Sequence, residues 1–264
     1  MSLLRRGLPL ILSLTLALAG ATSARAQAAL DEIQKTKTIR IAIPTDFPPY
    51  GSIGADMQPQ GLDIDIARLI ASKMGVKAEL IPTTTANRVP YLQTHRADLV
   101  ISTLGKNAER EKVIDFTMAY SPFFIAVFGP KTTAAAEPAA LAGKSIGVTR
   151  GSVDDAELTK VAPASTEVRR FEDNNSTISA FVAGQTQLVA TSAQVAAVMM
   201  EKNPKLGTEL KFVLKESPNF VGVAKGEDAL KAKVNEIIAQ AKADGTLDAI
   251  SKNWLGKPTG DLPL

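Results

Sequence analysis

The sequence predicts an α/β protein built from mostly parallel sheets flanked by helices. Short runs rich in β-branched residues alternate with longer segments in which apolar residues recur at helical spacing. This strand–helix order occurs twice along the chain, and Gly or Pro stands at several of the boundaries. Successive strand–helix–strand units favour parallel sheets covered by helices on both faces.

The first unit contains three expected strands and two expected helices. Residues 38–43 form a β-branched run that Pro44 ends. Residues 62–74 show helical spacing, and Gly75 stands where a helix commonly ends. The remaining elements are a strand at 76–81, a short helix at 87–94 and a strand at 97–101.

The second unit repeats this order after a soft segment at residues 131–138. Ser152 begins its first helix, and Asp155 three residues later gives a capping-box pattern. The other expected elements are strands at 144–148, 167–171 and 187–191 and helices at 175–182 and 192–202. Two units with one element order predict two similar lobes.

The C-terminal part is expected to be helical. One helix carries an apolar stripe that consists of Leu230, Val234, Ile237, Ile238 and Ala241. Asp244 and Gly245 end it, and a final helix follows with Trp254, which we expect to be a core anchor.

The first 26 residues are expected to be a signal peptide. Arg5 and Arg6 precede an apolar run at residues 8–19, and Ala24-Arg25-Ala26 has the small-x-small pattern of a cleavage site. The alternative, a membrane anchor, is disfavoured because a span needs about 20 apolar residues. The chain has no cysteine that could be lipidated or form a disulfide. We therefore expect a mature chain from Gln27 that is soluble in the periplasm.

The charge balance argues against nucleic acid and anionic membranes as partners. The full chain has 30 basic and 27 acidic side chains. Three of the basic ones are arginines of the leader, so the mature chain has 27 of each sign. No basic tract remains that would favour a polyanionic partner.

Four polar turns follow expected strands, at residues 45–50, 102–110, 149–153 and 191–194. In open parallel sheets, ligands bind beyond the carboxyl ends of strands, where helix N-termini also point. These turns are therefore expected to line a cleft between the lobes.

Catalytic and metal signatures are weak. The single histidine, His95, stands where a helix should end, and a favourable interaction with the helix C-terminus explains its presence there. With no cysteine, neither a Cys–His pair nor a His-rich metal site is expected, and no G-x-S-x-G, P-loop or dinucleotide motif occurs. We expect no enzyme activity and no cofactor.

Six segments in order resemble the polar amino-acid-binding proteins of ABC transporters, the family-3 solute-binding proteins. These are residues 45–50 (TDFPPY), 61–67 (GLDIDIA), 97–102 (ADLVIS), 109–116 (EREKVIDF), 143–148 (GKSIGV) and 243–247 (ADGTL). The resemblance implies a type II periplasmic binding protein with two crossover strands as its hinge. It implies a monomer that delivers an amino acid or related small carboxylate to a membrane permease–ATPase complex.

The resemblance also implies the lobe boundaries. The chain would cross between lobes near residues 121–125 and 215–220. Lobe I would combine residues 27–122 with 219–264, and lobe II would be residues 123–218.

Arg110 is the principal site residue that the resemblance implies. Its guanidinium would grip the ligand carboxylate through two parallel charge-assisted bonds. Asn107 is a good helix cap three residues earlier. The alternative is a surface arginine paired with Glu109 or Glu111.

Further ligand contacts are implied on both lobes. Gly151 and Ser152 would present amides to the same carboxylate. Ser102, Thr103 and Gly105 would add a carbonyl for an ammonium and amides for the carboxylate. Phe47 would stack on the ligand side chain, and Tyr50 is a weaker candidate for that contact.

Three departures from the family leave the ligand open. Relatives hold the α-ammonium with an Asp where this chain has Ser192, a second stacking residue where it has Thr85, and a small hydroxyl residue where it has Val153. Either another acid such as Asp46 approaches the ammonium, or the ligand is not an ordinary α-amino acid.

Two further alternatives stay open at this stage. Asn87 and Arg88 would supply polar contacts, although Arg88 as a solvated surface residue is an equal alternative. A few relatives are cyclohexadienyl or arogenate dehydratases, and a similar enzyme acting on a cyclic carboxylate would use an acid such as Asp46.

Overall fold

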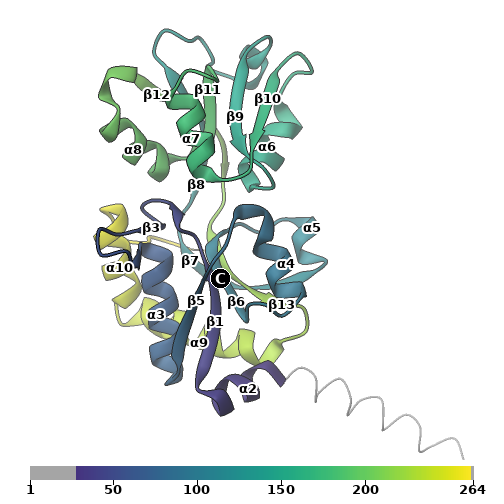
Figure 1. The fold of residues 1–264 in the computed structure, drawn as a ribbon, viewed down its shortest axis with the longest axis vertical. Helices are drawn as coiled ribbons and strands as arrows, with labels where there is room; N and C mark the ends of the chain where they lie inside the picture. Colours follow the sequence, from purple (N-terminus) through teal and green to yellow (C-terminus); the bar gives the residue numbers. More distant parts are fainter. Residues whose placement is uncertain (1–27, 263–264) are drawn as a thin grey trace, which may run out of the picture.

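The computed structural model describes residues 28–262, which fold into two lobes stacked one above the other (Figure 1). Each lobe contains one five-stranded sheet with helices against it. This confirms the predicted two-lobe α/β fold. The predicted signal peptide, residues 1–26, lies outside the described residues.

The sheet of the first lobe has the strand order β5–β1–β6–β13–β7. Its strands are β1 (Thr38–Ile43), β5 (Lys77–Pro82), β6 (Leu99–Leu104), β7 (Ile114–Ser121) and β13 (Asn219–Ala224). Strand β1 pairs in parallel with β5 and β6, whereas β13 is antiparallel to β6 and β7. Its helices are α2 (Ala28–Thr36), α3 (Leu62–Met74), α4 (Arg88–Gln93), α5 (Ala108–Glu111), α9 (Asp228–Ala243) and α10 (Thr246–Leu255).

The second sheet repeats this plan with the order β10–β9–β11–β8–β12. Its strands are β8 (Phe124–Pro130), β9 (Ser145–Thr149), β10 (Glu167–Phe171), β11 (Leu188–Ser192) and β12 (Thr208–Glu216). Strand β9 pairs in parallel with β10 and β11, and β8 is the antiparallel strand. The helices are α6 (Val153–Val161), α7 (Asn174–Val182) and α8 (Ala193–Lys202).

The chain passes between the sheets twice, from β7 to β8 and from β12 to β13. The two crossings lie side by side because β7 pairs with β13 and β8 pairs with β12. The amide of Ser217 donates to the carbonyl of Phe123 at 2.8 Å, which joins the crossings directly. Two short adjacent connections of this kind permit one lobe to rotate against the other.

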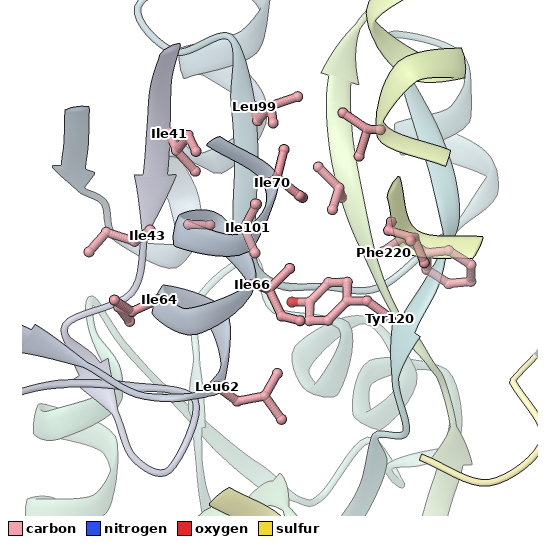
Figure 2. Packing of buried hydrophobic residues seen from close by; sticks show 14 of the residues in the cluster. Ile41, Ile43, Leu62, Ile64, Ile66, Ile70, Leu99, Ile101, Tyr120 and Phe220 are labelled. Carbon is pink, nitrogen blue, oxygen red and sulfur yellow. The ribbon is translucent and has the colours of Figure 1, made fainter. Parts of the chain in front are cut away.

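Helix α3 packs its apolar side on the first sheet (Figure 2). Its buried residues Leu62, Ile66 and Ile70 follow the predicted helical spacing, with Ile41 of β1 and Leu99 of β6 in the same core cluster. Gly75 ends the helix in the left-handed conformation, as predicted.

The terminal helices complete the first lobe. Helix α9 packs against β7, and α10 packs against α9 and α3. Trp254 is half-buried, and its indole Nε1 donates to Asp65 of α3 at 2.7 Å. Trp254 therefore anchors α10 by a hydrogen bond as well as by apolar packing.

Several elements were not predicted. Strands β7 and β8 fill residues 114–130, and a small sheet forms from β2 (Asp46–Phe47), β3 (Gly51–Ile53) and β4 (Pro59–Gln60). Strand β8 is buried along most of its length, so it lacks the polar–apolar alternation that marks a half-buried strand. None of the helices within residues 28–262 has the length and apolar character to cross a membrane.

The glycines around α3 give a test of the packing. Gly61 has φ 138°, and a Cβ there would collide with the backbone carbonyl of Tyr50, whereas Gly75 has φ 68° and open space around it. We expect Gly75→Ala to lower the free energy of unfolding by about 1 kcal/mol from backbone strain alone. Gly61→Ala should cost about 3 kcal/mol or more, because strain and collision act together.

Urea unfolding of the two variants measures the difference. Equal losses in the two variants would contradict the close approach of Gly61 to Tyr50.

Candidate functional site

A small cavity lies between the two lobes. It is lined by Phe47, Thr85, Arg88, Thr103, Phe123, Ser152, Val153, Asp154 and Asn174, which come from both halves of the chain. Its volume is about 10 Å³, roughly the space that one water molecule requires. In this structure the lobes are closed on each other, and they must separate to admit any amino acid.

Arg110 joins the two sides of this cleft. Asn107 caps the short helix α5 by accepting from the amide of Arg110 at 2.9 Å. The guanidinium then donates to the carbonyl of Gly105 at 2.7 Å and to that of Gly151, before α6, at 3.0 Å. The predicted position of Arg110 in the first turn of a helix is confirmed.

The alternative of a surface ion pair for Arg110 is wrong. Glu109 pairs instead with Lys112 at 2.7 Å, and Arg110 has no ion pair within residues 28–262. Burial and then the like charge of Arg88 lower the pKa of the Arg110 guanidinium to about 9, while Asp154 opposes the shift. Arg110 is thus a half-buried cation without an ion pair in the described part of the chain.

Arg88 is a second cation in the cleft, and the solvated-surface alternative for it is wrong. The side chain is 4% exposed and lines the cavity. Its Nη1 donates to the carbonyls of Ser102 at 2.6 Å and Thr103 at 3.1 Å, and its Nε donates to that of Thr85 at 3.1 Å. Burial lowers its pKa, and the neighbouring carboxylates oppose that shift.

The Thr103 turn is held from the other side by Asp63. Thr103 has φ 44°, an unusual conformation for a residue other than Gly. Its amide donates to Asp63 Oδ2 at 2.8 Å, while the Tyr120 hydroxyl donates to Asp63 Oδ1 at 2.7 Å. Asp63 and Arg88 thus fix the turn that leads to Gly105 and Arg110.

Asp46 occupies a different place from the one expected. Its Oδ2 accepts from the amide of Asn174 at 2.8 Å, and its Oδ1 accepts from the Asn174 side chain at 3.2 Å. Both oxygens therefore hold the N-terminus of α7, and in this structure Asp46 is a contact between lobes rather than a free acid beside the cavity.

Ser192 is fully buried, and its hydroxyl accepts from the amide of Val195 at 3.1 Å. It therefore caps α8, and it does not line the cavity. Ser152 caps α6 in the same way, accepting from the amide of Asp155 at 2.9 Å, as the capping pattern predicted. The reciprocal bond goes from the Gly151 amide to Asp155 Oδ2 at 3.2 Å.

The remaining predicted residues divide between cavity and core. Phe47, Thr85 and Val153 line the cavity. Gly105 faces Val153 so closely that an added Cβ would lie 2.8 Å from a Val153 methyl. Tyr50 is fully buried and stacks near Phe47, with ring centroids 6.1 Å apart, so it is core rather than a ligand contact.

Asp154 was not among the predicted site residues. It lies in the first turn of α6, is 7% exposed and lines the cavity, and its Oδ1 has no hydrogen-bond partner. Burial raises its pKa to about 6, against the lowering effects of the Ser152 hydroxyl, its own amide, Arg88 and Arg110. The sequence offered one clue, an acid two residues after the predicted cap.

No group of three or more His, Cys, Asp or Glu side chains that could hold a metal occurs within residues 28–262. The arrangement is instead suited to an anion. Arg88 is buried and lines the cavity, the half-buried Arg110 lies beside it, and both bond neutral carbonyl oxygens. A carboxylate there would receive charge-assisted hydrogen bonds.

Comparison with known proteins gives a consistent result. The family model for bacterial extracellular solute-binding proteins, family 3, matches residues 39–257. The L-cystine-binding protein TcyJ of Escherichia coli (strain K12) is 25% identical over 229 residues, covering 86% of each chain.

Two solved structures are similar over the whole fold. An ancestral arginine-binding protein bound to arginine has a TM-score of 0.79 and 31% identity, covering 83% of this chain and 99% of that one. The ancestral amino acid-binding protein AncCDT-1, described as a precursor of cyclohexadienyl dehydratase, has a TM-score of 0.78 and 29% identity, covering 86% and 99%.

The buried carboxyl of Asp63 gives a prediction for pH dependence. Burial raises its pKa from 3.8 to about 7, although the bonds from Tyr120 and Thr103 and the charge of Arg88 oppose the shift. A raised pKa stabilises the folded state while the group is protonated in it. This contribution is fully present below about pH 4 and is lost as the pH rises through 7.

We therefore expect Asp63→Asn to remove part of the fall in unfolding free energy between pH 5 and pH 8. Urea unfolding at both pH values measures it, with the exposed Asp261→Asn as the control. A fall as steep in Asp63→Asn as in the wild type would contradict the assignment.

Proposed function

The chain belongs to family 3 of the bacterial extracellular solute-binding proteins, and we propose that it captures its solute on Arg110 and delivers it to an ABC importer. The solute is an amino acid or a related small carboxylate. The observation that carries the proposal is that the Arg110 guanidinium bonds carbonyl groups from both sides of the cleft. A ligand anion at this point would contact both lobes at once.

Capture begins with the lobes apart. The carboxylate binds Arg110 beside the Thr103 turn, on the lobe that comprises residues 27–122 and 219–264. The lobe of residues 123–218 then rotates about the two crossings and adds Gly151 and Ser152.

The remaining contacts surround the rest of the solute. From the first lobe these are Ser102, Gly105, Phe47 and Thr85, and from the second lobe Val153, whereas Asp46 and Ser192 are engaged with Asn174 and Val195. Phe47 and Thr85 face the solute side chain. This set is the proposed binding site.

The carbonyl of Gly151 and the solute compete for the same hydrogen-bond donor, Arg110 Nη2. The carbonyl accepts from this nitrogen at 3.0 Å in the closed structure. A carboxylate forms stronger, charge-assisted bonds to a guanidinium than a neutral carbonyl does. The solute therefore replaces the Gly151 carbonyl as the acceptor for this nitrogen. Because this contact is made in the closed state, it shifts the population from open to closed molecules.

We also propose that the mature chain works as a monomer in the periplasm, and that it catalyses no reaction. Its family relatives are solute-binding proteins. The similarity to AncCDT-1 favours one competing function, dehydration of a cyclic carboxylate. The acid expected for that chemistry, Asp46, is bonded to Asn174 through both oxygens. Incubation with arogenate, followed by mass spectrometry, should return arogenate unchanged; formation of a dehydrated product would establish the competing function.

Removal of the guanidinium tests the binding proposal. The Tm of the wild type should rise with the concentration of at least one member of a panel of L-amino acids and small organic acids. In Arg110→Ala we expect the Kd of that solute to rise about 30-fold or more, since loss of one partner of a desolvated charge pair costs about 2–5 kcal/mol. Arg110→Lys should restore little, because an ammonium lacks the planar fork.

Arg96→Ala is the matched control. Arg96 stacks over Tyr91 at 4.3 Å from the ring centroid and does not line the cleft. If Arg110→Ala bound the solute as tightly as this control, Arg110 would not be the carboxylate ligand.

A further inference from the structure

The chain lacks an acid at Ser192, yet one acid lines the cavity between the lobes. Among the residues that line this cavity, Asp154 carries the one carboxylate. It stands three residues after Gly151, whose carbonyl bonds Arg110. An acid and the principal arginine therefore approach the same point from opposite lobes.

Asp154 differs from the other acids around the cleft in its bonding. Asp63 receives bonds on both oxygens from Thr103 and Tyr120, and Asp46 receives them on both from Asn174. Asp154 Oδ1 is buried without any partner. A buried polar atom of this kind is costly unless a hydrogen-bond donor reaches it.

Helix stabilisation does not account for Asp154. Acids in the first turn favour a helix through its dipole, but this effect does not require the carboxylate to be buried without a hydrogen-bond donor. The adjacent Asp155 has that role here, since it bonds the Gly151 amide and pairs with Arg170 at 2.8 Å. Asp154 is turned away from these partners and lines the cavity.

The surrounding charges define what would fit. Arg88 and Arg110 face Asp154 from the first lobe, near enough to lower its pKa, but neither forms an ion pair with it in the described part of the chain. A solute with a carboxylate at the guanidinium groups and a cationic nitrogen at Asp154 would match all three charges. A simple carboxylate would leave Asp154 Oδ1 without a donor.

Resting on the proposed function, we propose that Asp154 accepts the α-ammonium of the solute, so that the chain selects zwitterionic α-amino acids over simple carboxylic acids. The acid that relatives carry at the position of Ser192 is thereby replaced by one on α6. The closing lobe supplies it together with Gly151 and Ser152.

Paired ligands that differ only in the α-amino group test this. The probes are L-arginine with 5-guanidinopentanoic acid, and L-cystine with 3,3′-dithiodipropionic acid, measured by calorimetry at pH 8 so that the Asp154 carboxyl is ionised. We expect the Kd of the wild type for an amino acid to be about 10- to 100-fold lower than for its deaminated partner. A hydrogen bond between charged groups contributes a difference of this size. Asp154→Asn should reduce that ratio to near one.

Two further variants make the result specific. Glu157→Gln removes an acid from the same helix, but Glu157 pairs with Lys160 and Lys215 outside the cavity, so the ratio should stay at the wild-type value. Adding Ser192→Asp to Asp154→Asn should restore part of the preference. Asp154→Asn should not unfold the protein, since it removes a buried charge that has no ion pair and leaves one oxygen unbonded.

The outcomes separate the inference from the proposed function. A ratio unchanged in Asp154→Asn, or a wild type that binds the deaminated acids as tightly as the amino acids, would overturn the role of Asp154 while leaving a carboxylate-binding protein. A wild type that bound neither these probes nor any other carboxylate would overturn both.

Discussion

The closed cleft depends on two guanidinium groups, one buried and one half-buried, whose bonds go to neutral oxygens. Arg88 bonds the carbonyls of the 102–103 turn, and Arg110 bonds one carbonyl from each side of the cleft. A buried cation is costly until an anion approaches it. Carbonyl dipoles offset only part of that cost, which is reflected in the lowered pKa of both arginines. The site is thus electrostatically incomplete, and under the proposed function a carboxylate from outside would complete it.

The fold supports this site from both lobes without fixing their separation. Each sheet presents the carboxyl ends of its parallel strands to the cleft, so that short turns and helix N-termini converge there. The two crossings are adjacent and bonded to each other, an arrangement that permits rotation of one lobe against the other. The Asp46–Asn174 bonds lie near the cleft, where they favour closure without occupying the place of a ligand. The first core cluster includes Val153 and Val195 of the second lobe, so opening would separate some apolar contacts as well as these polar ones.

Much of the fold could be predicted from the sequence because its signals are local. The spacing of α3, its Gly75 stop and the Ser152 cap follow from side chains a few residues apart. Strand β8 was missed because a strand buried on both faces has no alternation to detect. The site was harder to predict, since it depends on the direction in which each side chain points. Asp154 and Asp155 are neighbours in one helical turn, yet one faces the cavity and the other bonds Arg170. Arg88 is the first residue of a short helix, and only the tertiary fold shows that it is buried.

The central claim is that a carboxylate completes the arginine site and holds the lobes together, and a distance across the cleft measures this most directly. The chain has no cysteine, so Gln93→Cys on α4 and Ser179→Cys on α7, both exposed, can carry a pair of spin labels without interference. Without solute we expect a broad distribution of label distances. With a saturating solute we expect one narrow distribution at the short end, and Arg110→Ala should keep the broad one. A distribution that the solute leaves unchanged in the wild type would contradict closure around a bound anion.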